Sequence, residues 1–169
     1  FFYMLSNLIY SRAFRVTALF TRAMYTQIDM GCEPSKCRVI ENGISYERLC
    51  DIPLKQEDGI VDIGAVVRLA PIKDIKTMVY AFFELSCRMD NVRLHIMGGV
   101  DDKEYADECY ALVKQLNLED KIIFTGRVNI IEYFEKLDFT LLTSISEGQP
   151  LSVLESFAAR RPCVTTDVG

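Results

Sequence analysis

The sequence has a single histidine, His95, and no two cysteines in the CxxC spacing that is typical of zinc and redox sites. These two absences argue against a zinc centre, and we expect neither a metal ion nor a cofactor. The six cysteines are scattered along the chain: Cys32, Cys37, Cys50, Cys87, Cys109 and Cys163. Four of the six cysteines lie in apolar or helical surroundings, which predicts buried free thiols of a cytoplasmic protein rather than a disulfide framework.

An excess of positive charge is also lacking. The formal net charge is −5, so we expect no general attraction to nucleic acid or to an anionic membrane. Any binding of phosphate must therefore depend on local donors. No apolar run is long enough to span a bilayer, because residues 1–10 are too few and no basic region precedes them as in a signal peptide.

The chain begins at Phe1 rather than at a methionine, and it stops at Gly169 directly after a predicted strand. We therefore expect a fragment of a longer protein. With 169 residues, 50% of them apolar, the chain is long enough for one domain with a substantial core.

From Gly59 onward, apolar strand-like runs alternate with helical patterns. Continuous apolar runs predict strands that are buried on both faces, and apolar residues at spacings of three and four predict helices. The predicted strands cover residues 60–67, 92–97, 122–125 and 139–142, and a further strand begins at Pro162. Repeated βα units of this length predict an α/β fold, a doubly wound, Rossmann-like parallel sheet, whose ligands bind at the carboxyl ends of its strands.

The segment that follows residues 139–142 predicts an anion site. A helix is expected over residues 150–159, with Pro150 as its first residue, because the fixed φ of proline suits that position and its missing N–H is not needed there. The N–H groups of the first helical turn have no partners within the helix, and the helix dipole adds positive charge. Residues 148–151 are therefore a candidate site for phosphate.

Glu155 is the only charged side chain in this predicted helix. A carboxylate among apolar neighbours needs a hydrogen-bonding partner, which makes Glu155 a candidate for ligand binding. The alternative is a solvated stripe that Glu155 shares with Ser152, Ser156 and Ala159.

Two cations follow the predicted strand 60–67. Arg68 closes the strand and Lys73 lies five positions further on, so the two together can clamp a diphosphate, Arg68 through its bidentate fork and Lys73 as a point charge. The alternative is a solvated loop in which these charges only balance Asp74.

Several motifs resemble the donor-site signature of retaining GT-B glycosyltransferases of family 4. They are SEGQPLSVLE at residues 146–155, the A-A-x-x-P and TTDVG that follow it, VVRLAPIKD at residues 66–74, and VIENGI at residues 39–44. Taken together, these motifs are most similar to those of the PelF branch, which works in exopolysaccharide synthesis. Arg160 replaces a glycine common in the family, which leaves the usual left-handed ending of the preceding helix open.

The resemblance implies a role for each matching residue. Arg68 and Lys73 would grip the diphosphate of the donor, Glu155 would accept hydrogen bonds from the ribose, and Glu147 would meet hydroxyls of the transferred sugar. The other implied contacts come mainly from backbone groups: Gly148, Gln149, Pro150 and Leu151 with the β-phosphate and sugar, and Gly126, Arg127 and Val128 with the base. His95 is expected in the core or in a strand rather than as a base.

The implied function is transfer of a hexose, with retention, from a nucleotide sugar of the UDP-glucose type to a saccharide acceptor. Residues 1–43 would be the end of an N-terminal GT-B domain with the linker, and residues 44–169 would be the nucleotide-sugar-binding domain, incomplete at its C-terminus. The resemblance implies no divalent metal, and it leaves room for peripheral association with a membrane export complex. Two alternatives are a GT-B-like sugar-nucleotide epimerase and a non-catalytic doubly wound binding module.

Overall fold

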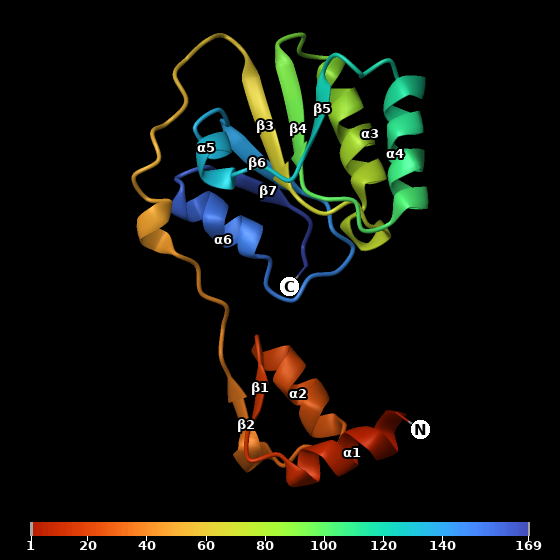
Figure 1. Ribbon diagram of the computed structural model, residues 1–169, viewed down its shortest axis with the longest axis vertical. Helices are drawn as coiled ribbons and strands as arrows, with labels where there is room; N and C mark the ends of the chain where they lie inside the picture. Colours follow the sequence, from red (N-terminus) through yellow and green to blue (C-terminus); the bar gives the residue numbers. More distant parts are fainter. Residues whose placement is uncertain (1, 169) are drawn as a thin grey trace. The chain divides into compact units, whose positions relative to one another are not determined.

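A computed structural model describes residues 2–168 and divides into two compact units, Phe1–Gly43 and Ile44–Gly169 (Figure 1). The first unit consists of α1 (Phe2–Arg12), β1 (Val16–Ala18), α2 (Thr21–Asp29), the 3-10 turn η1 (Pro34–Lys36) and β2 (Cys37–Val39). Its two strands pair in parallel. The assignment of this unit to the end of a preceding domain stays a prediction.

The second unit is a five-stranded parallel sheet, which confirms the predicted doubly wound fold. Its strands are β3 (Val61–Val66), β4 (Val92–Met97), β5 (Ile122–Gly126), β6 (Phe139–Leu142) and β7 (Cys163–Thr165), in the order β5-β4-β3-β6-β7. Its helices are α3 (Ile75–Ser86), α4 (Lys103–Gln115), α5 (Ile130–Phe134) and α6 (Leu151–Ala158), with 3-10 turns η2 (Tyr46–Arg48) and η3 (Pro71–Lys73).

The helices cover both faces of this sheet, as Figure 1 shows. On one face, Ile63 and Ala65 of β3 belong to the larger apolar core, which includes residues of α3 and α4. On the other face, a smaller core joins Phe134 of α5 to Ala158 of α6. Gly64 faces this second core, where a Cβ atom would lie only 2.3 Å from Cδ1 of Leu137, so a larger residue would require the Leu137 side chain to move. The alternation of neighbours along β3 follows from the two-residue period of a strand.

The order of the strands reverses at β3. The chain runs outward from β3 through β4 to β5, and then crosses back to place β6 on the other side of β3. In open α/β sheets, ligands bind outside the carboxyl ends of the strands at such a switch point. The loops after β3 and β6 are therefore where a ligand is expected.

Several predicted bounds needed correction. Pro150 is the N-cap residue of α6 rather than its first helical residue, because its ψ of 114° is extended. The strand predicted over residues 60–67 runs from Val61 to Val66, and the strand predicted over residues 122–125 extends to Gly126. Arg160 adopts a left-handed φ of 59°, so the usual backbone ending of this helix is kept although the glycine is absent.

Candidate functional site

The loops that follow β3 and β6 are hydrogen-bonded to each other. The N–H of Ile145 donates to the carbonyl of Ile72 at 2.9 Å, and the hydroxyl of Thr143 donates to the carbonyls of Lys73 and Asp74 at 3.2 and 3.0 Å. Residues more than 65 positions apart in the sequence therefore form one surface at the switch point of the sheet.

Lys73 and Glu147 meet on this surface. The Nζ atom of Lys73 lies 2.5 Å from Oε1 of Glu147, and the Ser144 hydroxyl donates to the same oxygen at 2.6 Å. The Lys73 and Glu147 side chains are only 17% and 11% exposed. Asp74 does not balance these charges, because its side chain caps α3 by accepting from the N–H of Thr77. The alternative of a loop in which Lys73 balances Asp74 is therefore wrong.

Arg68 lies apart from this pair. It follows β3 with a side chain that is 61% exposed, and it forms an ion pair with Asp101, which lies in the loop after β4. The N–H of Asp101 donates to the carbonyl of Leu69, which fixes the carboxylate beside the end of β3. The structure thus pairs both predicted clamp cations with carboxylates that come from two different loops.

The structure supports Glu155 as a ligand-binding residue more strongly than the sequence pattern does. Its carboxylate has no hydrogen bond or ion pair within residues 2–168, and burial raises its pKa. Ser156 and Ala159 are fully buried, and the Ser156 hydroxyl bonds with Thr140 at 2.7 Å. The alternative of a solvated stripe through Ser156 and Ala159 is therefore wrong.

The Glu155 side chain borders a small pocket of about 140 Å³. Residues of η2 and its surroundings and of the start of α5 complete the lining: Ser45, Arg48, Leu49, Asn129, Ile130 and Ile131. Such a pocket combines hydrogen-bonding groups with apolar walls, the mixture expected of a site for a small organic molecule.

The helix that carries Glu155 begins at the predicted anion site. Gly148, Gln149 and Pro150 form the half-buried loop before α6, and Leu151 is its first residue. Pro150, the N-cap residue of α6, makes no side-chain hydrogen bond to the first turn, where the N–H of Val153 donates to the carbonyl of Pro150 at 3.2 Å.

The ends of β4 and β5 meet beside these loops. The N–H of Gly98 donates to the carbonyl of Gly126 at 2.9 Å, and a Cβ atom on Gly98 would lie 1.9 Å from the carbonyl oxygen of Val67, so only glycine fits. Arg127 is exposed, with its guanidinium packed over Gly99, whereas Val128 is half-buried against the second core. The backbone of residues 126–128 thus follows β5 directly.

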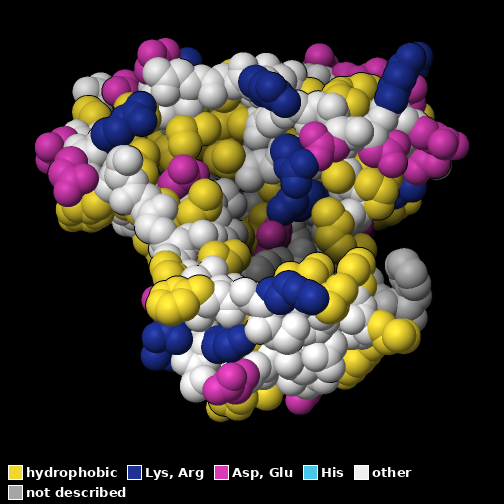
Figure 2. All heavy atoms as spheres, turned by 60° about the horizontal axis from the view of Figure 1, so that its bottom comes forward, with side chains coloured by type: hydrophobic (Ala, Val, Ile, Leu, Met, Phe, Trp, Pro, Cys, Tyr) yellow, Lys and Arg dark blue, Asp and Glu magenta, His cyan; other side chains and the backbone are white. Residues whose placement is uncertain are grey.

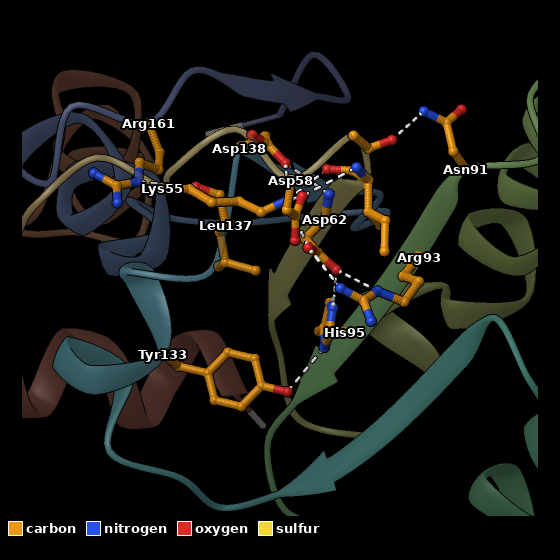
Figure 3. A network of polar contacts seen from close by, with 12 residues as sticks. Lys55, Asp58, Asp62, Asn91, Arg93, His95, Tyr133, Leu137, Asp138 and Arg161 are labelled. Atoms are coloured by element: carbon orange, nitrogen blue, oxygen red, sulfur yellow. Dashed lines mark hydrogen bonds and ion pairs between the residues drawn. The ribbon is translucent and has the colours of Figure 1, made fainter.

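A polar network that the sequence analysis missed lies toward the amino ends of β3 and β4. Asp62 is 2% exposed and accepts hydrogen bonds from Arg93 and His95, while Lys55 lies 2.7 Å away (Figure 3). The other ring nitrogen of His95 lies 2.8 Å from the Tyr133 hydroxyl. His95 is therefore a hydrogen-bonded core residue of β4, as expected. The sequence signal that could have revealed this network is Asp62, the single acid within the apolar run of residues 60–67.

Arg161 is a second residue whose role the sequence did not reveal. Its side chain is 1% exposed and donates only to backbone carbonyls. The acceptors lie at the ends of α5 and α6 and in the segment before β3: Phe134, Leu137, Ala159 and Pro53. The carbonyl ends of two helices carry partial negative charge, which explains how an arginine is buried without a carboxylate.

Charges of both signs are interspersed over the face shown in Figure 2, in keeping with the modest net charge. Within residues 2–168, no group of three or more histidine, cysteine, aspartate or glutamate side chains is arranged to hold a metal ion. None of the helices in the same range has the length and apolar character needed to cross a bilayer.

Comparison with known proteins places these residues in context. The family model of glycosyl transferases group 1 matches residues 60–169. The alpha-monoglucosyldiacylglycerol synthase of Streptococcus pneumoniae is 29% identical in an alignment of 142 residues that covers 75% of this chain and 32% of that protein. The N-acetylgalactosamine-N,N'-diacetylbacillosaminyl-diphospho-undecaprenol 4-alpha-N-acetylgalactosaminyltransferase of Campylobacter jejuni is 32% identical over 140 residues, 79% of this chain and 36% of that protein. The chain thus spans about a third of these relatives.

Solved structures share the fold at lower identity. Anabaena HepE, crystallised with UDP and glucose, matches with a TM-score of 0.84 at 20% identity, covering 98% of this chain and 48% of that one. TarM of S. aureus, in a complex that contains UDP, matches with a TM-score of 0.80 at 21% identity, covering 98% and 32%.

Proposed function

Because this chain belongs to the group 1 glycosyl transferases, we propose that it forms the nucleotide-sugar-binding half of a retaining glycosyltransferase. The observation that carries the proposal is the position of Glu155, a half-buried carboxylate without a partner in residues 2–168, beside a pocket and on the helix that starts at the switch point. A desolvated carboxylate is costly to keep unless a ligand supplies hydrogen-bond donors. Ribose hydroxyls are such donors.

The proposed donor is a nucleotide sugar of the UDP-glucose type. Arg68, Lys73 and N–H groups at the start of α6 would hold the diphosphate, and the backbone of residues 126–128 would contact the base. Two structural relatives were crystallised with UDP, and one of these complexes also contains glucose, which supports a uridine nucleotide. Glu147 would contact hydroxyls of the sugar, while its bond to Lys73 sets the position of the clamp lysine.

The proposed mechanism follows from these contacts. As the glycosidic bond breaks, negative charge grows on the departing diphosphate, and the two cations with the helix N–H groups stabilise it. These donors supply the charge stabilisation that a divalent ion would otherwise provide, so none is required. The acceptor hydroxyl attacks from the face that the phosphate leaves, which retains the anomeric configuration.

The wider setting is part of the same proposal. The acceptor would be a saccharide held mainly by an N-terminal GT-B domain, in a cytoplasmic enzyme of exopolysaccharide synthesis resembling the PelF branch. Two relatives are named for lipid-linked products, a glucosyldiacylglycerol and a diphospho-undecaprenol saccharide, which supports a peripheral association with a membrane export complex.

Isothermal calorimetry with UDP, GDP and ADP tests the donor site. We expect UDP to bind most tightly, to bind equally in EDTA, and to bind more weakly as salt rises, because the phosphate contacts are ionic. Loss of UDP binding in EDTA would contradict the metal-free clamp, and no binding of any nucleotide would favour the non-catalytic module. Conversion of a UDP-sugar by the full-length protein without an acceptor would favour the epimerase.

A further inference from the structure

Two cysteine thiols touch inside the first unit, far in the sequence from every donor-site residue. Cys32 lies shortly after α2, and Cys37 is the first residue of β2. The Sγ atom of Cys37 lies 3.2 Å from the Sγ atom of Cys32, and each residue is only 3% exposed. Within residues 2–168, no other two cysteines form such a contact.

The backbone on both sides holds this contact in place. Gly31, with a left-handed φ of 95°, turns the chain out of α2, and the N–H of Cys32 then donates to the carbonyl of Gln27 at 3.0 Å. The turn η1 brings the chain back, and Cys37 enters β2 opposite Val16 of the parallel strand β1. Hydrogen bonds thus hold the backbone in place on both sides of the thiol contact.

The distance between the two sulfurs indicates what chemistry suits these thiols. A disulfide bond is about 2.05 Å long, so a movement of about 1 Å separates the present contact from a bond. Burial, together with the hydrogen bond with Cys37, raises the pKa of Cys32 to about 11, so at neutral pH its thiol reacts only through the small fraction that is ionised. Bulky reagents are excluded by the burial, whereas an oxidant as small as a peroxide can enter through small local fluctuations.

We propose that Cys32 and Cys37 form a dithiol–disulfide site that is oxidised by a hydroperoxide. In the first step, one sulfur attacks the peroxide, takes one oxygen to become a sulfenic acid, and one water leaves. In the second step, the other sulfur attacks the sulfenic sulfur, the S–S bond forms, and the sulfenic oxygen leaves as a second water. Two protein thiols lose two electrons and two protons, and one hydrogen peroxide is reduced to two waters.

The site is reversible and therefore fits a reducing compartment. A small thiol that enters through the same local fluctuations reduces such a bridge by exchange, so the two cysteines stay free until peroxide appears. The short closed segment, residues 32–37, joins the end of α2 to the start of β2. Oxidation would therefore restrain the connection between these two elements.

Peptide mapping tests the proposal on the full chain. The chain is treated with hydrogen peroxide, quenched, alkylated without reductant and cut with trypsin. Trypsin cleaves after Lys36, so the proposed bridge joins the peptide of residues 23–36 to the dipeptide of residues 37–38. We expect this linked species, restored to two alkylated peptides by dithiothreitol, while Cys109 and the exposed Cys87 stay outside any bridge.

Three variants sharpen the test. Cys37→Ser and Cys32→Ser each remove one of the two sulfurs, so a sulfenic acid that reacts with dimedone should accumulate at the remaining cysteine in at least one of them, whereas the wild type should show none. Cys109→Ser is the matched control, since it removes a buried cysteine that has no sulfur partner and should leave the linked species unchanged. If Cys32 and Cys37 of the wild type both remain alkylatable after peroxide, or if another pair bridges first, the proposal is overturned. This measurement is made on the wild type, so it does not depend on whether a variant folds.

Discussion

At the scale of single residues, both cations that we assign to the donor diphosphate are already paired with acids. Lys73 contacts Glu147, and Arg68 contacts Asp101. The first pair is mostly buried and shares its acid with the Ser144 hydroxyl, whereas the second pair lies largely in solvent. A phosphate that enters the site must therefore displace or rearrange two carboxylates. The acids thus help to set the affinity of the donor.

Glu155→Gln should weaken the binding of UDP and of UDP-sugars alike, by about 1–3 kcal/mol, because hydrogen bonds from the ribose to a charged group are lost. The same change should raise the free energy of unfolding at pH 7. Burial raises the folded pKa of Glu155, so its ionised form destabilises the protein above that pKa, and an uncharged amide removes this cost. Calorimetry and urea denaturation measure the two effects. A weaker ligand site without a gain in stability would contradict this account.

Glu147→Gln should act on turnover rather than on nucleotide affinity. The substitution removes the negative charge that is bound to Lys73, so UDP should bind as well as before or better. Transfer by the full-length enzyme should fall about a hundredfold, as expected when a contact that strengthens in the transition state is lost. Equal loss of UDP binding in the Glu147 and Glu155 variants would contradict this division of roles.

Asp101→Asn should tighten UDP binding by up to about fivefold, because an exposed ion pair that competes for Arg68 is worth at most about 1 kcal/mol. The control is the same substitution in an Arg68→Ala background, where Asp101 has no cation to release and the affinity should not change further. Arg68→Ala alone should cost about 1.5–3 kcal/mol of binding. A gain that persists without Arg68 would show that Asp101 acts in another way.

At the scale of elements, the pocket beside Glu155 depends on how α5 and α6 are held against each other. Arg161 donates to carbonyls at the carboxyl ends of both helices and to the chain segment before β3. One buried guanidinium thus satisfies several carbonyls that lack intrahelical partners. The helix that carries Glu155 and the helix whose start lines the pocket are fixed at a common point.

Arg161→Met should lower the free energy of unfolding by about 2–5 kcal/mol, because buried carbonyls lose their donors and each unsatisfied group costs about 1–3 kcal/mol before relaxation. Arg160→Ala is the matched control. Arg160 is exposed and its side chain donates to the carbonyl of Ile52 at 2.8 Å, so its loss should cost under about 1 kcal/mol. Urea denaturation measures the free energy of unfolding of both variants. An equal loss in the two would contradict the role given to Arg161.

At the scale of the whole molecule, two polar regions occupy opposite ends of the sheet of the second unit. The candidate donor site lies at the carboxyl ends of β3 and β6, while Asp62, Arg93 and Asp138 lie toward the amino ends. Lys55, in the segment that leads into β3, contacts both Asp62 and Asp138. The second region thus fastens this segment to the sheet and leaves the carboxyl ends open for a ligand.

This network predicts the response to acid. Burial alone would raise the pKa of Asp62, but hydrogen bonds from Arg93, Lys55 and His95 outweigh it and hold the pKa well below its usual range. A carboxylate with a depressed folded pKa stabilises the protein above its unfolded pKa of about 3.9, and this stabilisation is lost as the pH falls toward the folded pKa. The urea midpoint should therefore fall below about pH 4.

Asp62→Asn should flatten this acid dependence. Asp90→Asn, at an exposed position that is 4.0 Å from Lys121, should keep the slope of the wild type. Parallel slopes in all three proteins would contradict the role of Asp62.

The sequence by itself determined the elements and their type, because the apolar period of each strand and helix is a local property. Runs such as residues 92–97 and 139–142 have the predicted bounds. The motifs around Glu147 and Glu155 also pointed to the loop before α6. Only the tertiary structure decided which charges meet: Lys73 with Glu147, Arg68 with Asp101, and Arg161 with carbonyls of three separate segments. Such contacts join residues that are far apart in the chain, and their energies depend on burial and distance, which appear only once the sheet has brought the strand ends together.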